Sequence, residues 1–118
     1  MMINTMKTAM IIASDAGART AGIIREELGK EVDLFSVSER SGCVRIDSIT
    51  DFTLRHFGDY EAFVFIGAMG ICVRAIAPCV TSKYADPAVV NVDATGHFVV
   101  SVLAGHVGGA NALTERLA

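Results

Sequence analysis

Short apolar runs separated by polar turns dominate the chain and predict strands. The predicted strands are 7–14, 32–37, 61–66, 88–92 and 97–103, because each run is rich in apolar residues and is bounded by turn residues. The run 61–66 lacks alternation of apolar and polar positions. This is typical of a central strand that is buried on both faces of a parallel sheet.

Between these runs, apolar residues recur at helical spacing. Over 18–28, Ala21, Ile24 and Leu28 share one face, and Gly29 is suited to end the helix. Further helices are predicted over 49–57 with Ser48 as N-cap, over a short segment ending at 77 before Pro78, and over 110–118. The polar stretch 38–47 is predicted to be a loop.

The order of these elements, β-α-β-α-β-α-β-β-α, predicts the fold class. Alternation of strands and helices indicates an α/β fold with three layers, a mainly parallel sheet flanked by helices. Residues 93–96 end in glycine and are too few for a parallel crossover, so 88–92 and 97–103 form an antiparallel hairpin near the C-terminal edge. We expect residues 1–118 to be a single domain. The final predicted helix is too short to be stable by itself, so we expect the chain to be a piece of a longer multidomain protein.

Composition narrows the class of protein further. Of the 118 residues, 52% are hydrophobic and 19% charged, which is typical of a domain that buries its own core. The net charge of −3 and the scattered basic residues argue against nucleic-acid binding. The longest apolar run, 62–73, is shorter than the ~20 residues needed to span a bilayer. We therefore expect a cytoplasmic protein without membrane contact. The three cysteines fit buried hydrophobic positions, and no metal-ligand spacing occurs, so no metal site is predicted.

Three loops follow predicted strands, and ligands of open α/β sheets bind outside the carboxyl ends of strands. These loops are 15–17, 67–70 and 105–111. In 67–70, Gly67 and Gly70 would let backbone N–H groups approach an anion at a helix N-terminus. The loop matches neither a dinucleotide fingerprint nor a P-loop. The alternative interpretation is a tight strand-to-helix turn.

The loop 105–111 has the more specific composition. Gly105, Gly108 and Gly109 fall within five residues, which favours a close approach of backbone to another group. His106 lies among them, and histidine is the residue type whose ordinary titration range suits acid–base chemistry near neutrality. The alternative interpretation is a structural glycine-rich turn in which the histidine ring makes its hydrogen bonds within the core.

For the other polar residues near these loops, a structural interpretation is favoured over a catalytic one when each residue is considered alone. Lys83 and Asp86 could form a surface ion pair, Asp86 could serve the turn before Pro87, and Asp93 could serve its hairpin. Arg74 completes this polar set. His56 and His97 are predicted to be structural or solvent-facing.

Three motifs together resemble one known family. They are 66–78 (IGAMGICVRAIAP), then Lys83 with 86–90 and Asp93, then 105–111 (GHVGGAN). Their order and spacing resemble the N-terminal region of the CbiG family of cobalamin biosynthesis proteins, the cobalt-precorrin-5A hydrolases. The first 60 residues match that family only in general strand and helix pattern.

The resemblance implies an enzyme of the anaerobic route to vitamin B12. The substrate would be a cobalt-corrinoid whose ring-A δ-lactone is hydrolysed with release of acetaldehyde, giving cobalt-precorrin-5B from cobalt-precorrin-5A. No cofactor is implied, since the substrate carries the cobalt. The partners implied are the substrate and C-terminal domains of the same polypeptide, without which this domain could be inactive; a homodimer is left open.

The resemblance and the chemistry of lactone opening together suggest roles for individual residues. The residues expected to act in catalysis are His106, Asp93 and Lys83. The residues expected to bind substrate are Gly67, Met69, Gly70, Arg74, Asp86, Gly105, Gly108, Gly109 and Asn111. Two other interpretations remain open: a Rossmann-like module that binds a nucleotide or another anion, and a non-catalytic domain that supports a catalytic partner.

Overall fold

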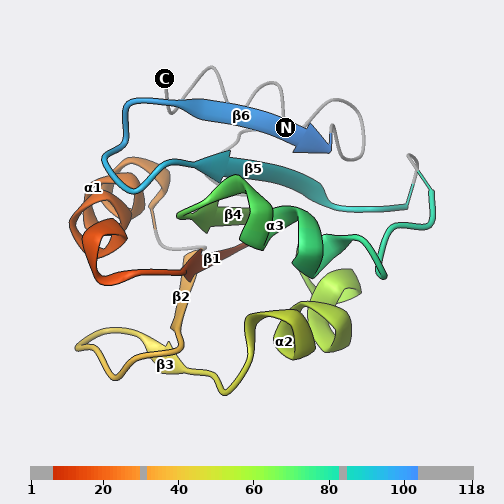
Figure 1. Cartoon of the computed structure of the whole chain (residues 1–118), viewed down its shortest axis with the longest axis horizontal. Helices are drawn as coiled ribbons and strands as arrows, with labels where there is room; N and C mark the ends of the chain where they lie inside the picture. The colour runs from red at the N-terminus through yellow and green to blue at the C-terminus, as the bar shows by residue number, and fades with distance from the viewer. Residues whose placement is uncertain (1–6, 30–31, 83–84, 104–118) are drawn as a thin grey trace.

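The computed structural model describes residues 7–29, 32–82 and 85–103 and shows an α/β fold (Figure 1). The strands are β1 (Thr8–Ile12), β2 (Val32–Ser36), β3 (Val44–Arg45), β4 (Ala62–Ile66), β5 (Ala88–Val92) and β6 (Val99–Leu103). The helices are α1 (Ala18–Leu28), α2 (Ile49–His56) and α3 (Met69–Ile76), with short 3₁₀ turns at Asp15–Gly17 and Phe57–Asp59. The predicted helix over 110–118 lies outside the described residues.

The strands form one sheet in the order β3-β2-β1-β4-β5-β6. All neighbouring pairs are parallel except β5 and β6, which are antiparallel. The predicted hairpin is therefore confirmed, and β4 is buried along its whole length as the absence of alternation indicated. The prediction for the stretch 38–47 was wrong: it was expected to be a loop, and it contains β3. Two residues paired to the edge of β2 are too few to produce a recognisable pattern in the sequence.

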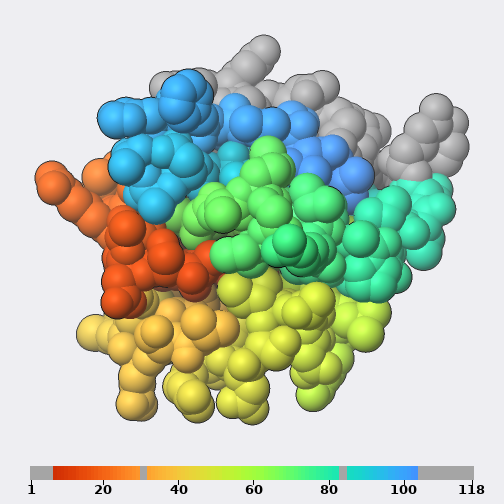
Figure 2. Space-filling model, viewed as in Figure 1, coloured from red at the N-terminus to blue at the C-terminus, as the bar shows by residue number. Residues whose placement is uncertain are grey.

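Helices cover both faces of the sheet, which confirms three layers. On one face, α1 buries Ala21, Ile24 and Leu28 against the apolar side chains of β1, β2, β4 and β5. On the other face, α2 and α3 pack over a cluster that includes Phe35, Phe63 and Phe65. The space-filling view in Figure 2 shows α3, in green, between α2 and the hairpin.

The second helix illustrates how local sequence sets the elements. Ser48 caps α2 as predicted, because its hydroxyl accepts a hydrogen bond from the Asp51 N–H at 3.2 Å. Inside the helix, the Thr53 hydroxyl donates to the Ile49 carbonyl at 2.7 Å, which satisfies a fully buried polar group. The helix ends at His56, one residue before the predicted end, and is followed by the 3₁₀ turn Phe57–Asp59, which contains the predicted stop residue Gly58.

Strand direction decides which loops meet at one edge of the sheet. The loops after β1, β4 and β5 leave from the carboxyl edge, where parallel strands end together. Because β6 runs the opposite way, its last residue, Leu103, pairs with Val89 near the amino edge. This corrects the expectation that 105–111 follows a strand ending at the carboxyl edge. In the described part of the chain, no helix is long and apolar enough to cross a membrane.

Candidate functional site

The carboxyl edge is built around Gly67, which directly follows β4. Gly67 is buried and has a φ of 148°, a backbone conformation that side chains rarely allow. A Cβ on Gly67 would lie 2.8 Å from the Cβ of Ala13, and the Gly67 N–H donates to the Val92 carbonyl at 2.9 Å. This glycine thus permits close packing between two loops, which is the tight-turn interpretation of the motif.

Gly17 has the matching role in the loop after β1. A Cβ on Gly17 would lie 2.8 Å from the Cγ2 of Ile66, the last residue of β4. The Ala13 N–H also donates to the Ile66 carbonyl at 3.0 Å. The loops after β1 and β4 are therefore in direct contact at the point where the following helices diverge to opposite faces of the sheet.

The N-terminus of α3 lies next to this contact and is open. Its N-cap residue, Ala68, offers no side-chain hydrogen bond, and the first turn has no acidic residue. Gly70 is exposed, and the nearest atom to its Cβ position is the Nη1 of Arg74, at 3.8 Å. The Ile71 N–H donates to the Ala68 carbonyl at 3.1 Å, whereas the Met69 and Gly70 N–H groups have no acceptor among the described residues. These two N–H groups, the positive end of the helix dipole and a guanidinium thus meet at one spot. This arrangement favours a carboxylate or another anion.

Asn91 is a buried polar residue that the sequence reasoning missed. It is 4% exposed, and its Nδ2 donates to the Gly67 carbonyl at 3.3 Å. Its Oδ1 is buried and makes no hydrogen bond with any described residue. An asparagine within the otherwise apolar run 88–92 was the available signal. The contact makes Asn91 a positioning residue for the turn that leads into α3.

Asp93 opens the hairpin at the same edge and organises it. Its carboxylate accepts hydrogen bonds from the Thr95 hydroxyl, from the Thr95 N–H at 3.3 Å and from the Phe98 N–H at 2.6 Å. The Thr95 hydroxyl and then the Phe98 N–H hold the pKa of Asp93 below its usual value. The hairpin is tied to α1, since the Thr20 hydroxyl donates to the Ala94 carbonyl at 2.7 Å.

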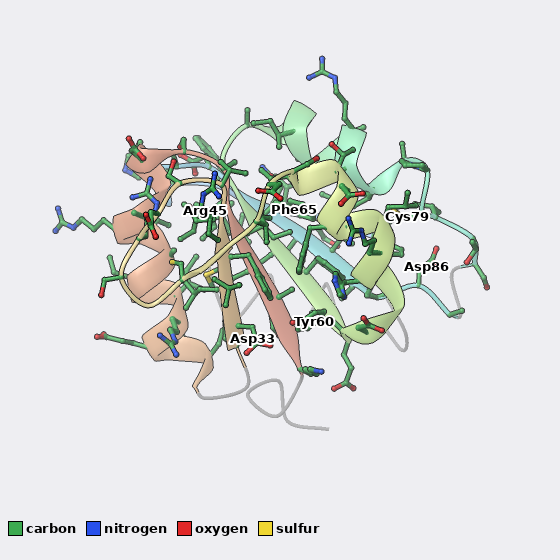
Figure 3. The ribbon with its side chains drawn as sticks, turned by 90° about the horizontal axis from the view of Figure 1, so that it is seen from below. Asp33, Arg45, Tyr60, Phe65, Cys79 and Asp86 are labelled. Atoms are coloured by element: carbon green, nitrogen blue, oxygen red, sulfur yellow. The ribbon has the colours of Figure 1, made fainter. Side chains whose placement is uncertain are left out.

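Asp86 lies at the opposite edge, before β5. It is 6% exposed and accepts hydrogen bonds from the Thr81 N–H and hydroxyl, both at 2.9 Å, and from the Ser82 N–H at 3.0 Å. The five residues of β5, about 17 Å of strand, separate it from Asp93. Asp86 also lies close to Cys79, whose thiol pKa is raised by burial and by this carboxylate (Figure 3).

The remaining predicted residues divide into two groups. Met69 and Gly70 form the first turn of α3, with Arg74 one turn later. The predicted site residues that lie outside the described part of the chain are Lys83, Gly105, His106, Gly108, Gly109 and Asn111.

The two described histidines are not part of this set. His97 is exposed at the hairpin, with its Nδ1 3.2 Å from the Thr95 hydroxyl, whereas His56 is half-buried and pairs with Asp59 at 2.8 Å. No three His, Cys, Asp or Glu residues are grouped for a metal ion within the ranges described.

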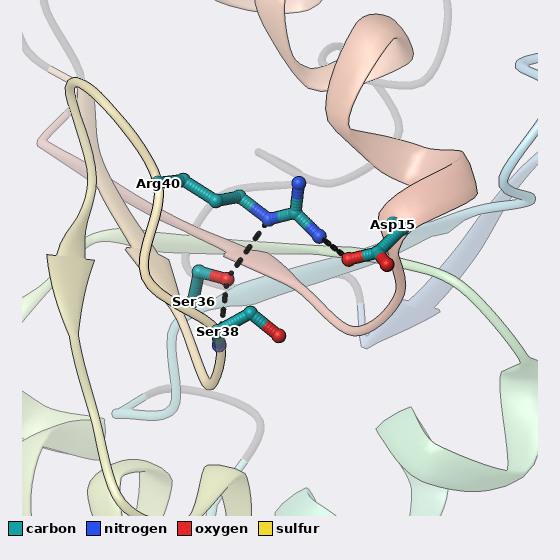
Figure 4. Close-up of polar contacts among 4 residues, drawn as sticks. All are labelled: Asp15, Ser36, Ser38 and Arg40. Atoms are coloured by element: carbon teal, nitrogen blue, oxygen red, sulfur yellow. Dashed lines mark hydrogen bonds and ion pairs between the residues drawn. The ribbon is translucent and has the colours of Figure 1, made fainter.

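A second polar cluster at the carboxyl edge was also missed from the sequence. Arg40, in the β2–β3 connection, donates to the carboxylate of Asp15 in the loop after β1 (Figure 4). Its Nε donates to the Ser36 hydroxyl at 3.2 Å, and the Ser38 N–H donates to the same oxygen at 3.2 Å. These contacts link the loop after β1 with the β2–β3 connection. The sequence predicted the first only as the break that ends a strand and the second only as a polar loop.

Comparison with protein families places the chain next to one that is named for cobalamin synthesis. The model of the cobalamin synthesis G N-terminal family matches residues 51–118, which include all the predicted site residues. This range also includes the turn into α3 and the β5–β6 hairpin.

Two curated relatives each align with this chain over 62 residues. Cobalt-precorrin-5A hydrolase of Salmonella typhimurium is 58% identical over 62 residues, 52% of this chain and 18% of the relative. The enzyme of the same name from Priestia megaterium is 48% identical over 62 residues, 52% of this chain and 17% of the relative. The matched part therefore spans less than a fifth of either enzyme.

One solved structure has a similar fold over nearly the whole chain. It is the crystal structure of a cobalamin biosynthesis protein G homologue from Sulfolobus solfataricus. The TM-score is 0.74 at 25% sequence identity, and the match covers 98% of this chain and 35% of that chain. The similarity thus extends to the N-terminal strands that the family model does not include.

Proposed function

We propose a function from the premise that the chain belongs to the cobalamin synthesis G N-terminal family. The chain acts in cobalamin biosynthesis, as a corrinoid-binding part of a cobalt-precorrin-5A hydrolase. The names of the two curated relatives support this activity. Further domains of the same polypeptide complete the site, in keeping with the greater length of those relatives.

The proposed reaction consumes one water and releases one two-carbon fragment. Water opens the ring-A δ-lactone of cobalt-precorrin-5A, and the two-carbon bridge then leaves as acetaldehyde, which gives cobalt-precorrin-5B. The protein must therefore hold a flat macrocycle with carboxylates on its rim, activate water, and stabilise the oxyanion that forms on the lactone carbonyl. We place this chemistry in the cytoplasm. The cobalt enters with the substrate.

The position of Arg74 over Gly70, at the uncapped N-terminus of α3, is the observation that carries the binding proposal. A rim carboxylate of the macrocycle would accept hydrogen bonds from the Met69 and Gly70 N–H groups at the start of the helix. The Arg74 guanidinium would pair with the same carboxylate from the side. Without a Cβ, Gly70 leaves the helix backbone accessible to the flat ring.

Asp93 and His106 suit different parts of the chemistry. A lowered pKa makes Asp93 a weak base, so its carboxylate suits orientation or charge stabilisation better than proton abstraction. We assign the water-activating role to His106, with Gly108 and Gly109 as candidate donors to the oxyanion. Lys83 and Asp86 remain proposals for contacts with the rim of the substrate. The three hydrogen bonds that Asp86 accepts within its own loop favour a structural role for this residue.

Binding is tested by titrating the 118-residue chain with cobyrinic acid, a cobalt-corrinoid with free rim carboxylates. The heptamethyl ester of the same corrinoid is the neutral comparison, and ATP and NAD represent the nucleotide alternative. We expect the free acid to raise the melting temperature, and Arg74→Gln to raise the Kd about tenfold, the loss of one charge-assisted contact. Arg45→Gln, on the remote edge strand β3, is the matched control and should leave binding unchanged.

Two outcomes would reject this function. A shift with a nucleotide and none with either corrinoid would favour the Rossmann-like binding module. Equal shifts for the acid and the ester, unaffected by Arg74→Gln, would remove the carboxylate site at α3.

Catalysis is tested separately in the full-length enzyme. His106→Ala should reduce kcat by about a hundredfold or more, the usual contribution of a general base. His97→Ala is the control, since His97 is exposed on the described hairpin and has no assigned role. If His97→Ala were inactive and His106→Ala normal, the base would be assigned to the hairpin instead.

A further inference from the structure

A pocket of about 220 Å³ lies between α1 and the β2–β3 connection, on the sheet face opposite α3. Its floor is apolar, because it is formed by two buried side chains, Ile12 at the end of β1 and Leu34 in the middle of β2. The β2–β3 connection supplies the outer wall, including Arg40 and Cys43. Neither the sequence motifs nor the proposed reaction assigns a role to this pocket.

Gly22 keeps the pocket open on the helix side. This glycine lies within α1, where alanine would make the helix more stable by about 0.5–1 kcal/mol. A Cβ at Gly22 would meet no atom within 4 Å, so tight packing does not explain the glycine. The position lines the pocket and is exposed. A larger side chain here would extend into the pocket.

The charge around the pocket is positive. Arg25, on α1 one turn after Gly22, makes no ion pair with any described residue. Arg40 is fixed at the far wall, because Ser36 and Asp15 engage its Nε and one terminal nitrogen. No acidic side chain is among the described residues that line the pocket. Because Asp15 already pairs with Arg40, Arg25 is the guanidinium left for a ligand, and an apolar floor beside it is complementary to an anion with a short hydrocarbon chain.

We propose that this pocket binds an aliphatic carboxylate of about three to five carbons, a size suited to a small pocket of about 220 Å³. The hydrocarbon chain covers Ile12 and Leu34, and the carboxylate pairs with Arg25 at the rim. Such a group has two sources: a free short-chain acid, or a carboxylate arm of a larger molecule. The second source rests on the proposed corrinoid function, and the first does not.

The test starts with free butyrate, followed by chemical shifts of backbone amides in the 118-residue chain. We expect saturable shifts confined to α1 and residues 40–43, with a Kd on the order of 1 mM for so small a ligand. Butyramide has the same shape without the charge, and inorganic phosphate has the charge without the chain. Both should bind at least tenfold more weakly.

Variants separate the site from general effects of salt. Gly22→Leu should abolish butyrate binding by filling the pocket while keeping a good helix former in α1. Arg25→Gln should raise the Kd about tenfold. Arg19→Gln is the matched control, because Arg19 is an exposed residue of the same helix that does not line the pocket.

Cysteine alkylation gives a second, independent measurement. Butyrate should slow the reaction of iodoacetamide with Cys43, which lines the pocket, and should leave Cys79 unaffected. Mass spectrometry of the digested protein measures both rates in one sample. Failure of butyrate to bind saturably, or binding that survives Gly22→Leu, would overturn the pocket proposal.

The corrinoid comparison then identifies the source of the carboxylate. If cobyrinic acid competes with butyrate for Cys43 protection and Gly22→Leu weakens corrinoid binding, the pocket takes an arm of the macrocycle. If butyrate protects Cys43 and the corrinoid does not, the natural ligand is a free acid. The latter result leaves the α3 site of the proposed function untouched, so the two proposals can fail separately.

Discussion

Gly67 packs against Ala13 so closely that the two loops after β1 and β4 have no space for one more carbon atom. A Cβ on Gly67 would lie 2.8 Å from the Cβ of Ala13, and the backbone of Gly67 has a φ of 148°. Gly70, three residues later, has the Arg74 guanidinium 3.8 Å from its Cβ position and, apart from its own helix backbone and chain neighbours, no other described atom within 4 Å. The two glycines of one motif therefore have different roles: Gly67 permits packing, and Gly70 leaves the helix N-terminus accessible.

Gly67→Ala should lower the free energy of unfolding by at least about 2 kcal/mol. The substitution forces a side chain into an unfavourable backbone conformation and also into contact with Ala13. Urea unfolding of the 118-residue chain measures the loss. Gly70→Ala is the control and should change stability by no more than about 1 kcal/mol. Equal losses for the two variants would mean that the motif acts as one structural turn.

Gly70→Leu should weaken corrinoid binding without unfolding the protein. The leucine would project at the N-terminus of α3, beside the Arg74 guanidinium, and would block the approach of a carboxylate to the first-turn N–H groups. Titration with cobyrinic acid should show a Kd at least tenfold higher, with a melting temperature near that of the parent. Unchanged affinity would place the corrinoid away from α3.

Asp86→Ala should destabilise the protein by about 2–3 kcal/mol, because the Thr81 and Ser82 donors would lose a charged acceptor in a buried loop. Thermal or urea unfolding measures the change. Asp47→Ala is the matched control: that side chain is 95% exposed and its ion pair with Arg45 spans 3.6 Å, so the change should be below about 0.5 kcal/mol. If Asp86→Ala folded normally and lost little unfolding free energy, the structural role would be rejected and a substrate contact would be favoured for Asp86.

The elements of the fold were predictable because they depend on local pattern. Ala21, Ile24 and Leu28 identify the buried face of α1, and Gly29, with a φ of 88°, ends the helix as predicted. The buried run 61–66 likewise identified β4 as a central strand. By contrast, β3 depends on pairing with β2 across a loop, and no local pattern encodes a contact of that kind.

The site was less predictable, since it depends on which loops meet. The sequence singled out Gly67 and Asp93 correctly as neighbours of the carboxyl edge. It grouped Asp86 with them, although β5 separates the two aspartates by its whole length. Sequence spacing does not show on which edge of the sheet a loop lies. The Arg40–Asp15 contact joins residues 25 positions apart, so it too requires the folded structure to be seen.

Gly22→Ala should stabilise the protein by about 0.5–1 kcal/mol, because the position is in the interior of α1 and a Cβ there meets no atom within 4 Å. Gly17→Ala provides the opposite case, since its Cβ would lie 2.8 Å from the Cγ2 of Ile66, and stability should fall. Urea unfolding of both variants gives the comparison. A destabilised Gly22→Ala variant would show that α1 packs more tightly than the open position indicates.

The pH dependence of stability should report on Asp93. The pKa of its carboxyl is lowered in the folded protein, chiefly by the Thr95 hydroxyl and the Phe98 N–H. The charged form is thus stabilised by folding, and this stabilisation is present above the pKa of the unfolded chain, about 4, and is lost as the pH falls through the lower folded value. The difference in unfolding free energy between the parent and Asp93→Ala should therefore be constant from about pH 5 to 8 and should shrink below about pH 4. Urea titrations of both proteins across this range measure the difference. Acid-sensitive groups that do not interact with Asp93 cancel because both proteins contain them, and His97→Ala in both backgrounds removes a histidine that does interact with it. A difference of the same size at about pH 3 and pH 7 would mean that the hairpin contacts of Asp93 do not depend on its charge.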